Sequence, residues 1–507
     1  EIVHAAIRND AKAFAHASDD LRNDRELTIS AVRGKGFALE FASDNLKNDR
    51  EVVTIAVQSH SYAYYYASPE LQNDESVIKA SIFHNSQVLR FAHVALQSDR
   101  KVVLVAVSWV GISLQFASTA HKNDREVVLT AVRESGDALE TASFDLRSDR
   151  GVVITAVHKN GLALVWASKE LQNDRVVVLA AVRQDGMALS SACKRFQNDR
   201  RVVLAAVRQD GMSLEFAAGK FAANREVVMA AVTNNGEALA FASPEFQDDR
   251  KVVMAAVTDY GNALQDASVR LQNDRSVVQA AVTNDGSALR WSSTSMKEDR
   301  KIVMIAVSKE GYSLHSASIT LRNDREVVMA AVKSNSRGIR WASAKLRTDH
   351  ELCMIAVSKN GDSLEDLCSD LQNDREIVKV AVCNCGYALR YASASLKNDK
   401  EIVLLAVNNT GWSMEYASDA LKKDCTVVLA ALKQHPDAFY HAAKELQSDV
   451  FLKGWRLSWR GARNRRAREA FLAKHSERNA HMLAKVDLWL LRNNFAHFIT
   501  AKRNFPL

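Results

Sequence analysis

A 25-residue unit repeats eighteen times between residues 1 and 450 without any insertion or deletion. Its consensus is close to E-V-V-L-A-A-V-R-Q-D-G-M-A-L-E-F-A-S-x-x-L-Q-N-D-R, and its positions are numbered here from 1 to 25. Self-similarity at a fixed period of this length is typical of a solenoid, in which each unit packs only against its neighbours. A residue that recurs in every unit is therefore first explained by a structural role.

The start of a helix is marked by position 24, which is Asp in seventeen units and Asn224 in the other. Both residue types are favoured at the N-cap, because their side-chain oxygens accept hydrogen bonds from free backbone N–H groups in the first turn. The predicted caps include Asp24, Asp49, Asp124 and Asp324.

The end of the same helix is marked by position 11, which is Gly in thirteen units, as at Gly111 and Gly136. Glycine there predicts a left-handed residue just past the C-terminus of a helix of about ten residues. Positions 2, 3, 6 and 7 are apolar almost throughout, and positions 4 and 5 are mostly apolar as well. A helix that is apolar nearly all round is expected to be buried.

A second, shorter helix is predicted from positions 14, 17 and 21, which hold a large residue, Ala and Leu in most units. This spacing places the three side chains on one face of a helix of about seven or eight residues. The β-branched run at positions 2 and 3 also suits a strand, but the capping Asp and the Ala at positions 5 and 6 favour a helix.

These patterns predict an all-α fold, a right-handed α-solenoid of eighteen 25-residue helical hairpins over residues 1–450. Residues 451–507 depart from the repeat and are predicted to form a basic, Trp-containing helical tail or cap. Because the chain opens in full register, further repeats or a targeting peptide before Glu1 are compatible with the sequence.

Residues 123–128 and 323–328 both read N-D-R-E-V-V. With this motif the repeat resembles a family catalogued as domain-of-unknown-function family number 4116, which carries tandem N-D-R-E-V-V-L-A-A-V motifs. The resemblance covers residues 1–450 and implies tandem helical repeats with no assigned activity.

Charge is concentrated at one end of the chain. The net charge is +7, yet residues 451–507 alone contain thirteen Lys or Arg and three acidic residues. A basic tail on a nearly neutral body indicates an anionic partner held at that end. The six cysteines follow no zinc-finger spacing and predict reduced thiols in an intracellular compartment rather than a secreted protein, with a mitochondrion or plastid also compatible.

The sequence contains no H-E-x-x-H, P-loop or G-x-S-x-G motif, and its histidines fall at scattered repeat positions. We therefore expect no enzymatic activity, no cofactor, no metal site and no small-molecule substrate.

The variable repeat positions are better candidates for recognition, because identical residues in every unit cannot distinguish one partner from another. Positions 15 and 16 pair a cation with an aromatic ring in four units: Arg90 and Phe91, Arg290 and Trp291, Arg340 and Trp341, and Arg390 and Tyr391. Such pairs could stack nucleic-acid bases or anchor a protein partner. The carboxylates of Glu365 and Asp366 in an intervening unit favour protein, and packing between units is the simpler alternative.

The tail combines indoles with guanidinium groups over a short span. The residues are Lys453, Trp455, Arg456, Trp459, Arg460, Arg463, Arg465, Arg466 and Arg468. This composition suits RNA phosphates or an anionic membrane surface, whereas the apolar residues that follow suit a cap on the last repeat.

The leading hypothesis is a scaffold or accessory subunit of a large assembly, which binds other proteins through its variable face and an anionic partner through its tail. The alternatives are an RNA-binding subunit of a ribonucleoprotein such as an organellar ribosome and, third, a peripheral membrane adaptor.

Overall fold

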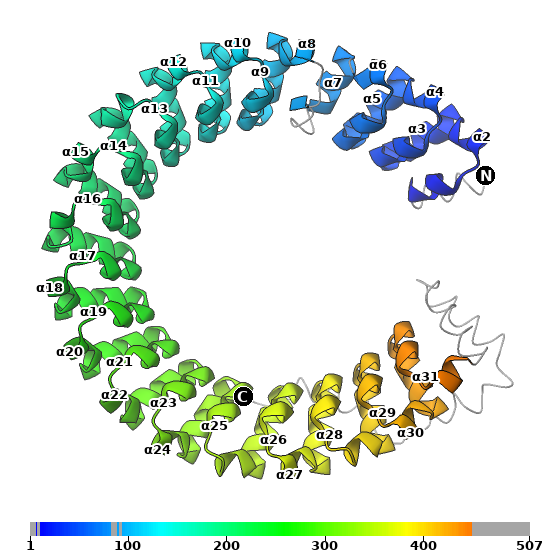
Figure 1. The fold of residues 1–507 in the computed structure, drawn as a ribbon, viewed down its shortest axis with the longest axis vertical. Helices are drawn as coiled ribbons and strands as arrows, with labels where there is room; N and C mark the ends of the chain where they lie inside the picture. Colours follow the sequence, from blue (N-terminus) through cyan, green and yellow to red (C-terminus); the bar gives the residue numbers. More distant parts are fainter. Residues whose placement is uncertain (1–6, 8–10, 73, 83–88, 91–93, 449–507) are drawn as a thin grey trace. The chain divides into compact units, whose positions relative to one another are not determined.

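The computed structural model describes residues 7, 11–72, 74–82, 89–90 and 94–448, which form helices and no strand. The chain divides into two compact units, Glu1–Asp259 and Tyr260–Leu507, and the division falls inside the repeat array. Within each unit, consecutive repeats pack side by side, so the predicted all-α repeat solenoid is confirmed (Figure 1).

The first helix of a repeat begins at position 25, directly after the capping Asp, and the predicted length of ten residues is confirmed. In the first unit these helices are α3 (Arg25–Gly34), α5 (Arg50–Ser59), α7 (Glu75–Ile82), α9 (Arg100–Trp109), α11 (Arg125–Glu134), α13 (Arg150–Lys159), α14 (Arg175–Gln184), α16 (Arg200–Gln209), α17 (Arg225–Asn234) and α19 (Arg250–Asp259). In the second unit they are α21 (Arg275–Asn284), α23 (Arg300–Lys309), α25 (Arg325–Ser334), α26 (His350–Lys359), α28 (Arg375–Asn384), α29 (Lys400–Asn409) and α31 (Cys425–Gln434).

A 3₁₀ helix follows at positions 11 to 16. In the first unit these are η1 (Ala11–His16), η2 (Gly36–Phe41), η3 (Ser61–Tyr66), η5 (Gly111–Phe116), η6 (Gly136–Thr141), η7 (Gly161–Trp166), η9 (Gly186–Ser191), η10 (Gly211–Phe216) and η12 (Gly236–Phe241). In the second unit they are η13 (Gly261–Asp266), η14 (Gly286–Trp291), η15 (Gly311–Ser316), η16 (Ser336–Trp341), η18 (Gly361–Asp366), η19 (Gly386–Tyr391), η21 (Gly411–Tyr416) and η22 (Pro436–His441).

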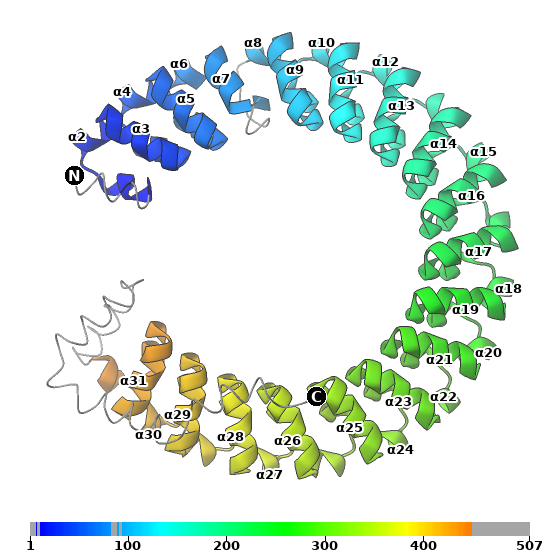
Figure 2. The ribbon, with the colours of Figure 1, turned by 180° about the vertical axis from the view of Figure 1, so that it is seen from behind.

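A third, very short helix completes the repeat near positions 19 to 22. In the first unit these are α2 (Asp19–Arg22), α4 (Asp44–Lys47), α6 (Pro69–Gln72), α8 (Val94–Gln97), α10 (Thr119–Lys122), α12 (Phe144–Arg147), η8 (Leu171–Asn173), α15 (Lys194–Gln197), η11 (Gly219–Phe221) and α18 (Pro244–Gln247). In the second unit they are α20 (Val269–Gln272), α22 (Thr294–Glu298), α24 (Ile319–Arg322), η17 (Leu346–Thr348), α27 (Ser369–Gln372), η20 (Leu396–Asn398), α30 (Asp419–Lys422) and α32 (Lys444–Gln447). Within each unit, these short helices lie along one edge of the array and the ten-residue helices lie along the other edge, as both views show (Figures 1 and 2).

The sequence predicted a single second helix, and this prediction was wrong. The helix is interrupted at positions 17 and 18. Ala142 and Ser143 are extended, with ψ of 155° and 160°. Ser143 N–H donates to the carbonyl oxygen of Lys122 in the preceding repeat at 2.8 Å, instead of bonding within its own helix. The repeat contact therefore breaks the helix.

The core lies between the ten-residue helices and the 3₁₀ helices. In α11, Val127, Val128, Ala131 and Val132 are fully buried, and Leu139 of η6 is fully buried against them. The first helix was predicted to be buried, and this holds for only one face: positions 1, 4, 5 and 8 lie on an outward face, where α11 presents half-buried or exposed side chains. The apolar residues at positions 4 and 5 are thus only partly covered in most repeats, whereas Leu404, Leu405 and Leu429 are buried.

Glycine at position 11 has a different role from the one predicted. Gly111 and Gly136 are not left-handed; each begins a 3₁₀ helix, after an extended residue with φ of −142° or −141°. A Cβ atom on Gly136 would lie 2.5 Å from the carbonyl oxygen of Ala156 in the next repeat. Glycine is required here because neighbouring repeats approach each other at their backbones.

Among the described residues, no helix has the length and apolar character needed to cross a membrane.

Candidate functional site

The polar residues shared by most repeats bind the adjacent repeat. Asp149 accepts hydrogen bonds from the backbone N–H groups of Gly151 and Val152, at 2.8 and 3.0 Å, and so caps α13. Its other oxygen accepts from Nε of Arg125 in the preceding repeat at 2.9 Å. The same capping is present at Asp24, Asp49, Asp124 and Asp324, so these four predicted caps are confirmed.

The arginine at position 25 bridges two acids where the next ten-residue helix carries Glu as its second residue, directly after the residue that follows the capping Asp. Arg300 donates through Nε to Asp324 at 2.8 Å and through Nη2 to Glu326. Hydrogen bonding to Arg300 lowers the pKa of Asp324, as Arg125 does for Asp149. The Asn-Asp-Arg motif is therefore used in contacts between repeats.

A second set of bonds joins position 18 to position 23 of the preceding repeat. Ser143 Oγ donates to Asn123 Oδ1 at 2.5 Å, and Ser343 Oγ donates to Asn323 Oδ1 at 2.6 Å. Cys193 takes the place of the serine in its repeat, with Sγ at 2.9 Å from Asn173 Oδ1. Sequence reasoning missed this pairing, although the frequent Ser at position 18 was the available signal.

A third set involves position 9, whose side chain caps the 3₁₀ helix of the preceding repeat. Asn234 Oδ1 accepts from the Gly211 N–H at 2.7 Å, while its Nδ2 donates to the carbonyl oxygen of Arg208 at 3.2 Å. Asn384 makes the equivalent bonds. Together, these three sets account for most of the recurrent polar side chains.

The first of the fully described Arg-aromatic pairs lies on η14. The guanidinium carbon of Arg290 lies 4.6 Å from the ring centroid of Trp291, and Arg290 is exposed. Trp291 Nε1 donates to Asn262 Oδ1 of the preceding repeat at 3.2 Å. The indole is thus fixed against its neighbour while the cation covers its face.

The second pair, on η16, has a similar arrangement. Arg340 Cζ lies 5.9 Å from the ring centroid of Trp341, whose edge packs against His315 of the preceding repeat with centroids 4.7 Å apart. Arg340 Nε also lies 3.6 Å from Asp366 Oδ1 in the following repeat. The Asp366 side chain is only 7 % exposed, and burial raises its pKa.

The third pair lies on η19, where Arg390 Cζ is 4.3 Å from the ring centroid of Tyr391 and Nη2 also contacts the phenol oxygen. Tyr391 donates to Glu365 Oε2 of the preceding repeat at 3.0 Å. In all three pairs, a fixed aromatic ring therefore lies beneath an exposed arginine. The rings do pack between repeats, as the simpler alternative expected, but the arginines remain accessible.

Of two further predicted sites, one lies partly and the other wholly outside the described residues. Phe91 lies outside the described residues. Its neighbour Arg90 lowers the pKa of Tyr65 and so opposes the rise that burial causes in that pKa. The tail residues Lys453, Trp455, Arg456, Trp459, Arg460, Arg463, Arg465, Arg466 and Arg468 all lie outside the described residues, so the tail remains a prediction.

The cysteines of the chain are free thiols. Burial raises the pKa of Cys383 and of Cys385, and Cys385 Sγ lies 3.7 Å from Asp362 Oδ1. Within the part of the chain that the structure describes, no cluster of three or more metal-ligating side chains occurs.

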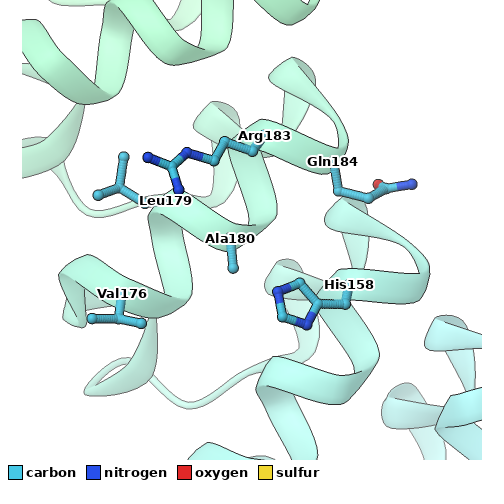
Figure 3. A pocket seen from close by; sticks show the side chains of 6 residues that line it. All are labelled: His158, Val176, Leu179, Ala180, Arg183 and Gln184. Atoms are coloured by element: carbon cyan, nitrogen blue, oxygen red, sulfur yellow. The ribbon is translucent and has the colours of Figure 1, made fainter.

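The outward face of the ten-residue helices is a surface that sequence reasoning missed. Between α13 and α14 it is hollowed to about 510 Å³, lined by His158, Val176, Leu179, Ala180, Arg183 and Gln184 (Figure 3). The His158 ring lies opposite Ala180, and the Arg183 side chain extends toward Leu179 (Figure 3). A comparable hollow between α21 and α23 includes Thr283, Met304 and Ile305. The signal in the sequence was the mixture of cations and aliphatic residues at positions 4, 5 and 8.

Comparison with known sequences identifies the repeat. The profile of the family described as Domain of unknown function (DUF4116) matches residues 1–47, 24–72, 99–147, 149–197, 177–222, 199–247, 224–272, 249–297, 299–347, 349–397 and 399–447. These matches follow the repeat register and together cover most of the chain. No curated protein matches the chain.

Proposed function

We propose that this protein, which belongs to the family described as Domain of unknown function (DUF4116), is a non-catalytic scaffold or accessory subunit of a larger assembly. Its repeats form a helical architecture of the kind that scaffolds use. In this proposal, exposed side chains at the variable positions bind other proteins, and the basic tail binds an anionic partner.

The observation that carries the proposal is the recurrence of an exposed arginine on a fixed aromatic ring. Arg290, Arg340 and Arg390 occupy the same position in alternate repeats of the second unit. Arg, Trp and Tyr dominate the energetics of protein interfaces, and a ring that is already immobilised loses little side-chain entropy on binding. These pairs are therefore preorganised anchors.

Carboxylates near the pairs favour a protein over a nucleic acid. Glu365 accepts a hydrogen bond from Tyr391, and Asp366 lies beside Arg340. A phosphate backbone that followed this face would meet the exposed carboxylate of Glu365, whereas a protein can place donors against Glu365 and acceptors against the arginines.

The proposal is tested by affinity purification of the intact protein from its own cells, with quantitative mass spectrometry of the copurifying proteins. The wild type is compared with Arg290/Arg340/Arg390→Ala. We expect one defined set of proteins to be retained by the wild type and reduced by about tenfold or more with the variant, since interface arginines often contribute more than about 1 kcal/mol each.

The matched control is Lys309/Lys333/Lys345→Ala, which removes the same charge from exposed positions elsewhere in the same unit. Equal losses with both variants, or no protein specific to the wild type, would rule out the Arg-aromatic surface as the anchor.

The tail is tested separately, in the full chain, by Arg463/Arg465/Arg466/Arg468→Gln. RNA binding that falls with salt and is lost in this variant would support the ribonucleoprotein alternative, because phosphate contacts release counterions. Co-sedimentation with anionic vesicles, lost in the same variant, would support the membrane adaptor. Absence of both at low salt would leave the tail as a protein-binding segment or cap.

A further inference from the structure

A second surface of the first unit differs from the rest of the array in its charge. Position 8 of four consecutive repeats is basic, as Arg133, His158, Arg183 and Arg208, and all four side chains are exposed. Helices α13, α14 and α16 contain no acidic residue, and Lys159 and Arg201 add further cations to this region. The acids of α11 are confined to Glu126 and Glu134, at the margin of the site.

These cations are not neutralised by the repeat contacts. Among the described residues, the side chains of Arg133, His158, Arg183 and Arg201 take part in no ion pair. Arg208 has one distant acid, with Nη2 at 3.9 Å from Glu226 Oε1. By contrast, Arg125, at position 25, donates a hydrogen bond to Asp149 of the next repeat. The arginines at position 8 are thus available to an external anion.

The surface between these basic side chains is aliphatic. Ile154 and Leu179 are half-buried at position 4, and Val176 at position 1 is 54 % exposed. Val176, Leu179 and Ala180 supply the apolar lining of the hollow of about 510 Å³ between α13 and α14, which His158 and Arg183 also line (Figure 3). The surface therefore combines apolar area with regularly repeated positive charge.

This combination favours a peptide over a nucleic acid. No Phe, Tyr or Trp occurs in α13, α14 or α16, so His158 is the one ring that these helices offer for bases to stack on. Aliphatic side chains of a peptide can instead fill the hollow, as in helix-in-groove recognition.

The spacing of the cations indicates the conformation of such a peptide. Packed helices lie about 8–10 Å apart, which sets the separation of equivalent residues in successive repeats. Residues i and i+7 of an α-helix lie on nearly the same face and about 10.5 Å apart. Carboxylates seven residues apart therefore match the cations of successive repeats.

We propose that the outward face of α13, α14 and α16 binds an acidic amphipathic helix of another protein, with carboxylates on the basic side chains of position 8 and aliphatic side chains in the hollow. This surface lies in the first unit and does not depend on the Arg-aromatic surface of the second. Failure of either proposal leaves the other unaffected.

The test uses the full chain and a fluorescent helical peptide of about 22 residues, which at ~1.5 Å per residue spans the site. The peptide carries Glu at every seventh position beside a Leu stripe, and a permuted peptide has the same composition without this spacing. Binding is measured by fluorescence anisotropy at about 50 mM salt, where exposed charges are weakly screened. A single-stranded oligouridylate is the nucleic-acid probe.

We expect the patterned peptide to bind the wild type more tightly than the permuted peptide does. The patterned peptide should bind the variant Arg183/Arg201/Arg208→Gln about tenfold more weakly than it binds the wild type, because three exposed ion pairs are lost. Substitution of the same residues by Lys should retain most of the affinity, since the charge is kept. The control Lys169/Lys194/Arg195→Gln removes equal charge from the opposite edge of the same region and should leave binding unchanged.

Circular dichroism melting of each variant verifies that the fold is retained. The proposal is overturned if the patterned peptide does not bind the wild type, if both peptides bind equally, if the control variant loses as much as the test variant, or if oligouridylate binds more tightly at the same residues.

Discussion

Arg125 Nε lies 2.9 Å from Asp149 Oδ2, so the first residue of α11 binds the N-cap residue of α13 in the next repeat. The same carboxylate accepts two backbone N–H groups with its other oxygen. One aspartate thereby begins a helix and joins two repeats, which explains why position 24 is the least variable polar position in the array.

Asp324→Ala should destabilise the protein by about 1 kcal/mol through loss of the α25 cap alone, with a further loss from the contact with Arg300. Asp324→Asn should cost less, because an asparagine accepts the same backbone hydrogen bonds, as Asn224 does at Val227. Urea unfolding followed by circular dichroism measures both. A larger loss for Asn than for Ala would show that capping is not the main role.

Stability should fall as the pH drops below about 4, the ordinary range of an aspartate. The pKa values of Asp124, Asp149 and Asp324 are lowered, chiefly by hydrogen bonds from arginines of the preceding repeats. A depressed pKa contributes stability that is complete above the unfolded-state value and is lost as the pH falls through the folded-state value. Thermal unfolding between pH 7 and pH 3 measures this loss, and Asp149→Asn should make it smaller.

Gly186→Ala should destabilise the protein by about 1–3 kcal/mol, because its Cβ would lie 2.5 Å from the backbone carbonyl oxygen of Ala206 and the two repeats would have to separate. Gly219→Ala is the matched control, since nothing lies within 4 Å of its Cβ. It should be neutral or raise stability by less than about 1 kcal/mol. Comparison of the two unfolding midpoints tests whether close approach, rather than backbone freedom, requires glycine at position 11.

Arg340→Ala should destabilise the second unit by about 1 kcal/mol at neutral pH, because the buried carboxylate of Asp366 loses its nearest cation. Burial already raises the pKa of Asp366, and loss of Arg340 should raise it further. An acid with a raised pKa binds its proton more tightly in the folded state, so stability falls as the pH rises through the folded-state value.

The loss in Arg340→Ala should therefore be smaller at pH 4 than at pH 7, when measured by thermal unfolding. When both proteins also carry Asp366→Asn, the loss of stability caused by Arg340→Ala should no longer depend on pH. A loss that is the same at both pH values in the single variant would show that packing on Trp341, rather than charge, is responsible.

The sequence predicted the first helix of each repeat because its signals are local. Capping requires only that Asp149 precede the free N–H groups of its own first turn, and the periodic valines of α13 define a buried face whatever the partner. The second helix was predicted as one element because Leu139 and Ala142 have helical spacing, but the bond from Ser143 to Lys122 of the preceding repeat was not visible from one unit.

The candidate surfaces show the same difference between features that follow from one repeat and features that depend on contacts between repeats. The sequence identified Arg290 and Trp291 as neighbours, yet the bond from Trp291 to Asn262 joins residues 29 apart. The outward position of Leu179 was missed, because hydrophobicity by itself does not distinguish a side chain facing the core from one lining an open groove.

The sequence by itself determined the period, the helical class and the capping of each first helix, because these depend on interactions within about one helical turn. Only the tertiary structure decided why Gly136 is glycine, which rings support the arginines and which helix face stays uncovered. The physical reason is that each of these depends on how closely one repeat approaches the next, a distance set by the packing of both.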